Sequence, residues 1–390
     1  MIIGSNKYKN LFFNTIVFTI GSFGSKLLSL LLNNLYTKHI SPPQLYTKTL
    51  VEMLALFLIP VFTFSLGEAV IRFGLDNRYD KTKIFTTTSI LSLAGLLLMT
   101  LFVPLIHLIP FFASLNSYTL LLIAYIFASS LRAQCSQFVR SREMVKLFSL
   151  DGILTTLMLL IFNIIFISHL GLGVKGFMLS TILSDLCSAV FLFLSAGLRK
   201  YLNINAFSFS LGKVMLRFCI PLIPTTVMWT FTGFSDQLFI GGMKGNSDAG
   251  IYSAAAKIPN LISMLSTIFF QAWNMSAITE NESKDRDVFY EKVYGAYEAV
   301  LFIGSAFLIL MIKPVSAVMI NYSVFPEYSR AYIYTPLLIA AALYTCLDLF
   351  LASIYTATKY TVNAFVTIFA AFILNIILNF ILIPVMDIQG

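Results

Sequence analysis

The chain has 390 residues, of which 58% are apolar and only 11% are Asp, Glu, Lys or Arg. Soluble domains have about 45–50% apolar and about 25% charged residues, so this composition excludes a water-soluble protein. The formal net charge is +8, but the basic residues lie in short loops between apolar segments. This distribution is typical of membrane topology and not of a nucleic-acid-binding surface. We therefore expect an integral membrane protein that is surrounded by membrane lipids and binds no nucleic acid.

Apolar segments long enough to span a bilayer recur along the whole chain. A helix needs about 20 residues to cross a hydrocarbon core of about 30 Å. The runs are continuous, which favours helices over barrel strands that alternate over about ten residues. We predict an all-α integral membrane fold with about 11 transmembrane helices and no soluble domain. The predicted spans are 11–35, 46–66, 84–109, 117–138, 147–169, 174–198, 214–240, 251–278, 295–321, 331–352 and 360–384.

Lysines and arginines are concentrated on one side of these spans. They occur in the N-terminal segment, as Lys7 and Lys9, and in the loops after every second span. Because cytoplasmic loops carry an excess of basic residues, we predict a cytoplasmic N-terminus. Prolines inside spans are expected to kink or break them. Pro221 and Pro224 in one span suit a helix that bends during transport, and a static packing kink is the alternative.

A faint internal repeat is visible in the chain. Tyr46 opens the second span as Tyr252 opens the eighth, and the end of the fifth span resembles the end of the eleventh. Two copies of six spans each would enter the membrane from the same side. We predict two pseudo-symmetric six-helix bundles, 1–205 and 206–390, around a central cavity. The last span of a 12-helix design is then missing, and the alternative is that the eleventh span ends the native chain.

Several segments carry a resemblance to a known family. They are residues 14–26, 67–73, 221–224, 235–241, 250–259 and 269–273. Their arrangement resembles the polysaccharide biosynthesis flippases of the multidrug/oligosaccharidyl-lipid/polysaccharide exporter superfamily, in particular the O-antigen or capsule repeat-unit type. The resemblance implies a transporter in the bacterial inner membrane that is not an enzyme and needs no cofactor. Its implied substrate is an undecaprenyl-pyrophosphate-linked oligosaccharide for lipopolysaccharide or capsule, moved from the cytoplasmic to the periplasmic leaflet. Polysaccharide assembly proteins, such as a polymerase, are the implied partners.

Basic residues within or beside the spans are the candidates for substrate binding. An ionisable group in mid-membrane costs a few kcal/mol, so such groups usually face a cavity or each other. A diphosphate headgroup needs cations in a wet cavity to cross the membrane. The predicted substrate-binding residues are Lys26, Arg217 and Lys257, with Arg72 at the cytoplasmic mouth.

Acidic residues within the spans are the candidates for coupling transport to an ion gradient, with H⁺ or Na⁺ as the coupling ion. Asp236 is the first choice and Glu52 the second. The alternative is that both belong to structural ion pairs with Lys26 and Lys257. Asp185 lies in the middle of a predicted span and is as easily explained by capping or snorkelling.

Other classes of membrane protein fit the sequence less well. No GxxxxGK[ST] motif occurs, which disfavours an ATP-driven pump. A multidrug or organic-cation antiporter of the same superfamily is the main alternative, and a cavity dominated by carboxylates would favour it. A polytopic polysaccharide polymerase is more remote, because the outer loops are short and the only histidines are His39, His107 and His169.

Overall fold

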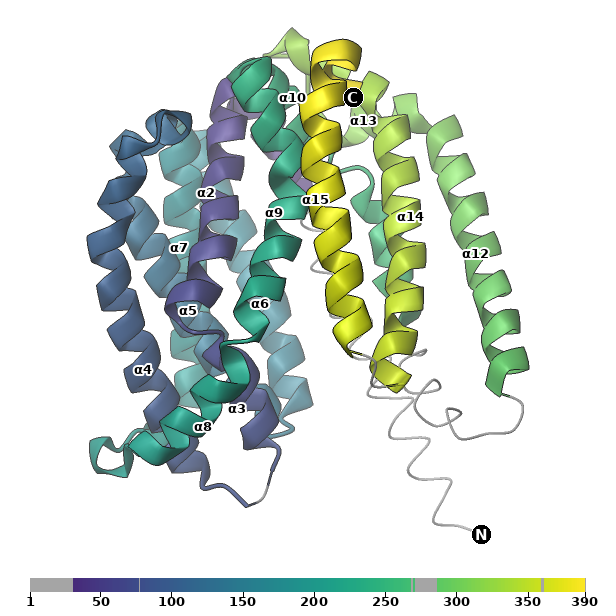
Figure 1. The fold of residues 1–390 in the computed structure, drawn as a ribbon. Helices are drawn as coiled ribbons and strands as arrows, with labels where there is room; N and C mark the ends of the chain where they lie inside the picture. Colours follow the sequence, from purple (N-terminus) through teal and green to yellow (C-terminus); the bar gives the residue numbers. More distant parts are fainter. Residues whose placement is uncertain (1–30, 77, 268, 271–285, 359–360, 390) are drawn as a thin grey trace. The chain divides into compact units, whose positions relative to one another are not determined.

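The computed structural model describes residues 31–76, 78–267, 269–270, 286–358 and 361–389. Every regular element in this part of the chain is a helix (Figure 1), which confirms the all-α expectation. The chain forms two compact units, each described by itself below. Unit 1 comprises Met1–Tyr46 with Ser235–Gly390, and unit 2 comprises Thr47–Phe234.

These units do not coincide with the two predicted bundles, whose boundary stays a prediction. Residues 31–46 belong to unit 1 because they bond to its later part. The side-chain amide of Asn33 donates to the carbonyl of Met319 at 3.1 Å, and the Tyr328 hydroxyl donates to the carbonyl of Ile40 at 2.9 Å.

The predicted spans agree with the helices in the described part of the chain. Eight helices there are long and apolar enough to cross a membrane, and a bent pair makes up to nine. Each coincides with one predicted span. The predicted span 11–35 lies largely outside the described residues and 251–278 partly outside them, so the total of eleven stays a prediction.

Unit 2 is a bundle built mainly from local helix pairs. Its α-helices are α2 (Pro42–Phe62) from Thr47 onward, α3 (Leu66–Gly74), α4 (Lys81–Phe102), α5 (Thr119–Ser141), α6 (Val145–Asn163), α7 (Gly173–Ser195), α8 (Phe209–Cys219) and the first part of α9 (Leu222–Met243). The shorter elements are η1 (Val103–Leu108), η2 (Pro110–Tyr118), the π-helical η3 (Ile164–His169), η4 (Leu198–Tyr201) and η5 (Ile204–Ala206). Helix α7 packs along α5 and α6, and α3 packs against α4, α5 and α8.

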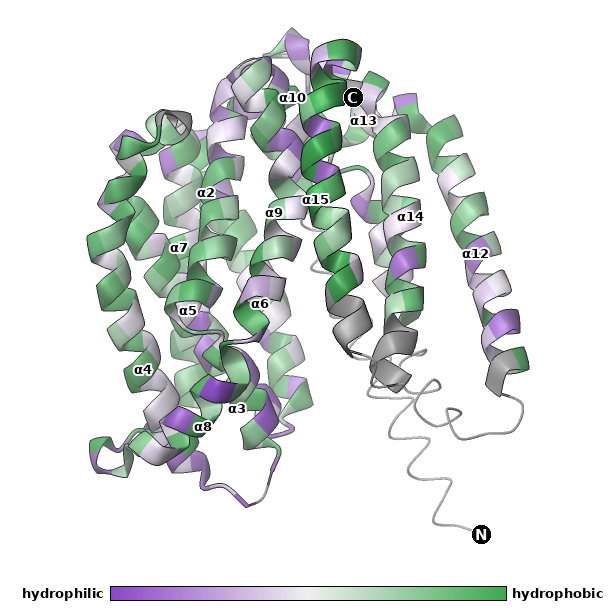
Figure 2. Ribbon diagram, viewed as in Figure 1, coloured by the Kyte–Doolittle hydropathy of each residue, from purple (hydrophilic) through white to green (hydrophobic). Residues whose placement is uncertain are grey.

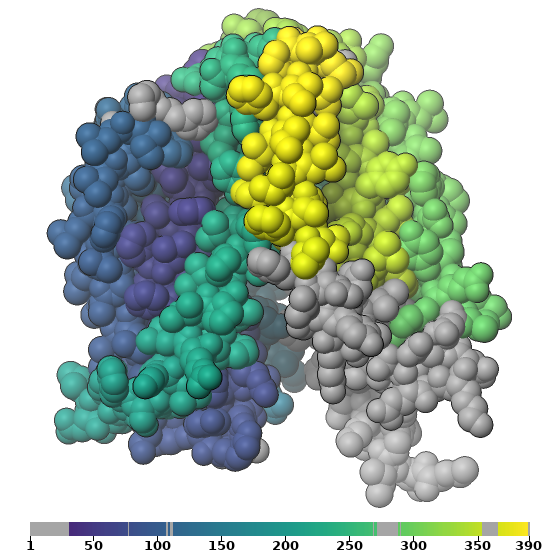
Figure 3. Space-filling model, in the orientation of Figure 1, coloured from purple at the N-terminus to yellow at the C-terminus, as the bar shows by residue number. Residues whose placement is uncertain are grey.

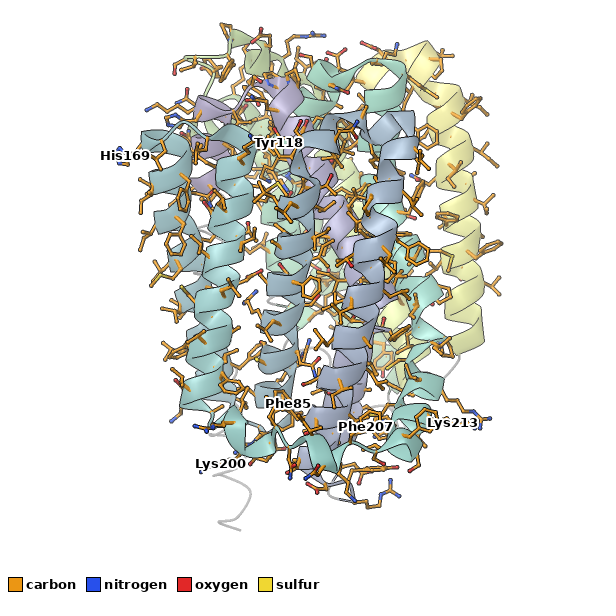
Figure 4. All side chains as sticks on the ribbon, turned by 90° about the vertical axis from the view of Figure 1, so that its left-hand side faces the viewer. Phe85, Tyr118, His169, Lys200, Phe207 and Lys213 are labelled. Carbon is orange, nitrogen blue, oxygen red and sulfur yellow. The ribbon has the colours of Figure 1, made fainter. Side chains whose placement is uncertain are left out.

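The two ends of unit 2 carry different residues. At one end, Phe85 and Phe138 belong to a buried cluster, with ring centroids 4.5 Å apart. Figure 4 shows Lys200 and Lys213 at this same end and His169 at the opposite end. This placement agrees with the alternation of loops in the predicted topology.

Figure 2 shows that the helices are largely hydrophobic, while hydrophilic residues gather on α3, on α8 and in the nearby loop. Between α8 and α9 the chain bends by 44°. Pro221 lies in this break, one residue before α9 begins. The predicted proline kink is therefore confirmed, whereas bending during transport stays a prediction.

Unit 1 is organised around α14. Its elements are the helical residues 31–39, the end of α9, α10 (Asn246–Ala255), α12 (Arg286–Leu310), α13 (Ile312–Met319), η6 (Pro326–Arg330), α14 (Ala331–Thr358), α15 (Thr361–Met386) and η7 (Asp387–Gln389). Helix α14 packs against α10, α12, α13 and α15. Gly250 of α10 lets the chain approach closely, because a Cβ there would lie 1.8 Å from the carbonyl oxygen of Pro42.

Candidate functional site

Helix α8 carries a surface groove of about 760 Å³ in unit 2. The helix is amphipathic: Leu211 and Met215 are buried against α3 and α4, whereas Phe209 is 76% exposed. Its first turn is held by Ser208, whose hydroxyl accepts a hydrogen bond from the backbone N–H of Leu211. Apolar lining residues of the groove include Leu91, Phe207, Phe209, Leu216 and Ile220. Figure 3 shows α8 at the surface of unit 2.

Two cations line this apolar groove. Lys213 and Arg217 are four residues apart on α8, so they share one face of the helix. Both are exposed, and neither pairs with a carboxylate of the described residues. An apolar trough with two uncompensated positive charges is complementary to an anionic amphiphile.

The structure brings together only some of the cations predicted to bind substrate. Arg217 lies in the α8 groove, and Arg72 is exposed in the last turn of α3, which packs against α8. Lys257 is half-buried in the turn after α10 and belongs to unit 1. Lys26 lies outside the described residues. A joint site formed by all four cations therefore stays a prediction.

Asp236 lies in a pocket of about 250 Å³ inside unit 1, whose largely aliphatic wall carries a few polar side chains. The Tyr252 hydroxyl donates to its Oδ2 at 2.8 Å, and the Asn379 amide donates to its Oδ1 at 2.9 Å. Ser235 on the same helix donates to Oδ1 of Asn375, which also accepts from Asn379 at 3.3 Å. Helices α9, α10 and α15 thus place four oxygen-bearing side chains at one cavity, namely Asp236, Tyr252, Asn375 and Asn379.

This arrangement leaves the charge of Asp236 without a cationic partner among the described residues. The carboxylate receives only neutral hydrogen-bond donors, and it lines a pocket together with Asn375 and Asn379. Carboxylate and amide oxygens are the ligands that hard cations prefer, and an unpaired carboxylate also accepts a proton. The pocket therefore has the chemistry of a small cation site.

Glu52, the second candidate for ion coupling, is engaged differently. Its Oε1 lies 2.7 Å from Nζ of Lys48, one turn earlier on α2. Lys48 is 2% exposed, and its ammonium group also lies 4.5 Å from the ring centroid of Phe177. Both the aliphatic stem and the charge of Lys48 are therefore buried in unit 2. Glu52 thus forms an ion pair with a residue of its own helix, whereas the expected pairing with Lys26 or Lys257 stays a prediction.

A buried ionic network in unit 2 was not recognised from the sequence. Arg132 of α5 lies 3.7 Å from a carboxylate oxygen of Asp151 on α6 and 3.7 Å from one of Asp185 on α7. Ser188 donates to Asp151, and Ser129 donates to Asp185. Asp185 is therefore part of an interhelical network, and the capping and snorkelling explanations were wrong. An arginine inside a predicted span was the signal that pointed to it.

Several solved structures have a fold similar to that of this chain. The fold is similar to the inward-facing conformation of a multidrug resistance MATE family transporter of the MOP superfamily, with a TM-score of 0.61 at 17% identity over 85% of this chain and 84% of that chain. The outward-facing conformation of a multidrug resistance MATE family transporter of the MOP superfamily has a TM-score of 0.61 at 16% identity, over 89% of this chain and 82% of that chain. The crystal structure of MATE in complex with MaL6 has a TM-score of 0.60 at 17% identity, over 94% of this chain and 85% of that chain.

The amino-acid sequence assigns the chain to one family. The chain belongs to the polysaccharide biosynthesis protein family, whose model matches residues 11–274. No curated protein sequence matches the chain significantly. The family is thus that of polysaccharide biosynthesis proteins, and the fold is similar to that of multidrug resistance MATE transporters.

Proposed function

We propose that this protein moves a lipid-linked oligosaccharide with a diphosphate headgroup between the leaflets of the bacterial inner membrane, with its N-terminus in the cytoplasm. The observation that carries the proposal is the α8 groove, in which Lys213 and Arg217 line an apolar trough without a carboxylate partner among the described residues. The family, which is that of polysaccharide biosynthesis proteins, supports the same substrate class.

The chemistry of the groove suits both parts of such a substrate. A diphosphate carries about two negative charges and cannot cross hydrocarbon without compensating cations. Arginine binds phosphate oxygens in pairs, and lysine adds a compact point charge. The exposed apolar side chains of α8, such as Phe209 and Ile220, offer contacts to a polyprenyl tail. Arg72 on the adjoining α3 would add a third cation.

Asp236 is the proposed coupling residue. Its pocket collects oxygens from α9, α10 and α15, and no cation neutralises it among the described residues. Binding of H⁺ or Na⁺ there would change the charge of the pocket and so bias the packing of these helices. Glu52 suits this role less well because Lys48 already compensates its charge.

The proposal is tested by transport of a fluorescent undecaprenyl-diphosphate oligosaccharide in proteoliposomes. Variants Lys213→Gln and Arg217→Gln should each slow transport at least tenfold, because an unpaired headgroup charge costs more than about 1.4 kcal/mol. Lys200→Gln is the matched control, since Lys200 is an exposed cation at the same end of unit 2 outside the groove lining. Equal rates in all three variants would refute the role of the groove.

A multidrug or organic-cation antiporter is the second candidate. It is favoured by the fold similarity to multidrug resistance MATE transporters and by the carboxylate in the Asp236 pocket. The same proteoliposomes distinguish the two functions when loaded with ethidium instead of the oligosaccharide. Ethidium movement that depends on Asp236 and persists in Arg217→Gln would support the antiporter and contradict the flippase.

A further inference from the structure

The helical span that begins with α2 is interrupted before α3. Phe64 and Ser65 have φ of 55° and 50°, in the left-handed region that residues with a side chain rarely adopt. The backbone N–H of Ser65 donates to the carbonyl of Pro60 at 2.8 Å. The break lies against Gly95 of α4, where a Cβ would come within 1.8 Å of the carbonyl oxygen of Phe62. Broken helices inside membrane proteins are tolerated where they line a cavity.

A polar pocket of about 160 Å³ opens beside this break. It is enclosed by residues of α2, α3, α4, α5 and α9, all within unit 2. Its polar lining residues include Thr63, Ser65, Glu68, Ser130, Gln137 and Thr226. Glu68 is the one ionisable residue among the described lining residues. A pocket of this size holds several water-sized groups.

Several of the lining hydroxyls have already donated their hydrogen to the backbone. Thr63 donates to the carbonyl of Ile59 at 2.7 Å, and Thr226 donates to the carbonyl of Leu222 at 3.1 Å. Each of these oxygens keeps a lone pair that can only accept. Thr63 and Thr226 therefore offer acceptors to an occupant, while the Gln137 amide and the Ser130 hydroxyl also carry donors.

Two further polar atoms of the lining have no hydrogen-bond partner within the described part of the chain. They are Oγ of Ser130, a residue that is 6% exposed, and the buried Oε1 of Gln137. Leaving such atoms unsatisfied in a protein interior is unfavourable, because each has lost its hydrogen bonds to water. An occupant with several hydroxyl groups would satisfy them, because each hydroxyl donates one hydrogen bond.

We propose that this pocket binds a sugar ring of the transported molecule. The inference rests on the proposed function and names the part of the substrate that the pocket contacts. A sugar ring is neutral, and its hydroxyl groups both donate and accept hydrogen bonds, which suits a lining of hydroxyl and amide side chains. A small cation at Glu68 is the competing occupant, but the neutral hydroxyl and amide side chains form most of the polar lining.

The position of the pocket relative to the α8 groove supports this assignment. Leu91 of α4 lines the groove, and the next residue, Ser92, lines the pocket. On the other side, Pro221 lines the groove and Thr226 lines the pocket. The two cavities therefore lie at the same level of unit 2 on neighbouring faces of α4. In a lipid-linked oligosaccharide the first sugar is bonded directly to the diphosphate, so adjacent sites for the two groups match its covalent order.

The test compares binding of two probes by the full-length protein in nanodiscs. One probe is undecaprenyl diphosphate carrying a single glucose, galactose or N-acetylglucosamine, and the other is sugar-free undecaprenyl diphosphate. Wild-type protein should bind at least one glycosylated probe about tenfold more tightly than the sugar-free probe. Ser130→Ala with Gln137→Leu should remove this preference and leave the affinity for the sugar-free probe unchanged.

Ser149→Ala is the matched control, because Ser149 also has a buried hydroxyl without a partner among the described residues but lies outside the pocket lining. If wild-type protein binds neither probe, the proposed function itself fails. If it binds both probes equally, or if the double variant keeps the preference, only the sugar pocket is refuted. Loss of sugar preference on adding Na⁺, abolished by Glu68→Gln, would assign the pocket to a cation and overturn the inference.

Discussion

Arg132 of α5 lies 3.7 Å from Asp151 of α6, measured between Nη2 and Oδ2. The Asp151 side chain is 1% exposed and also receives the Ser188 hydroxyl from α7. Because Asp185 of α7 lies at the same distance from the guanidinium, one arginine joins three helices. Two carboxylates face a single cation, and the hydroxyls of Ser188 and Ser129 add hydrogen bonds that stabilise the excess negative charge.

Removing the guanidinium should destabilise the protein strongly. Arg132→Gln leaves two buried carboxylates without their cation, and losing one partner of a buried pair costs about 3–5 kcal/mol. Since the Arg132 side chain is 32% exposed, we expect about 2–4 kcal/mol, measured as a lower melting temperature in detergent. Adding Asp151→Asn and Asp185→Asn should restore part of the loss. A triple variant no more stable than Arg132→Gln would contradict the network.

The two candidates for ion coupling should behave differently. Asp236→Asn removes the charge from an unpaired carboxylate, so transport should no longer respond to a proton or sodium gradient. Glu52→Gln removes the partner of buried Lys48, so it should lower the amount of folded protein while the remaining molecules keep their ion dependence. The measurement is the initial transport rate with and without each imposed gradient, per folded molecule. Loss of ion response in Glu52→Gln alone would reverse the assignment.

The contact between α4 and the end of α2 should not tolerate a side chain at Gly95. A Cβ there meets the Phe62 carbonyl at 1.8 Å, so Gly95→Ala must displace backbone. Overpacking typically costs about 1–3 kcal/mol, and we expect a lower yield of folded protein at the upper end of that range. Gly152→Ala in α6 is the control: nothing lies within 4 Å of its Cβ position, so stability should stay equal or rise by about 0.5–1 kcal/mol. Equal yields of the two variants would show that the contact between Gly95 and Phe62 can accommodate a side chain.

The bend between α8 and α9 should depend on Pro221 and not on Pro224. Pro221 lies in the break, where alanine would supply an N–H that favours a continuous helix. Pro224 lies in the first turn of α9, where backbone N–H groups have no helical partner in any case. Spin labels on α8 and α9 should report a longer separation in Pro221→Ala and no change in Pro224→Ala, with transport slowed several-fold only in the first. An unchanged distance in Pro221→Ala would attribute the bend to packing.

The sequence alone determined the class of fold and the approximate limits of the spans. Both follow from runs of apolar residues, which are local properties of the chain. Every span crosses the same hydrocarbon thickness, so each run has a similar length. The cost of charge in a membrane likewise singled out Asp236 and Arg217 before any contact was known. In the structure these two residues line separate cavities.

Only the tertiary structure decided which partners each charge meets. Arg132, Asp151 and Asp185 are far apart in the chain and belong to three different helices, so no spacing rule connects them. The left-handed residues Phe64 and Ser65 carry no local signal of a break either, since neither is a glycine. Such features depend on packing between helices, and the free energy that maintains them comes from residues distant in sequence.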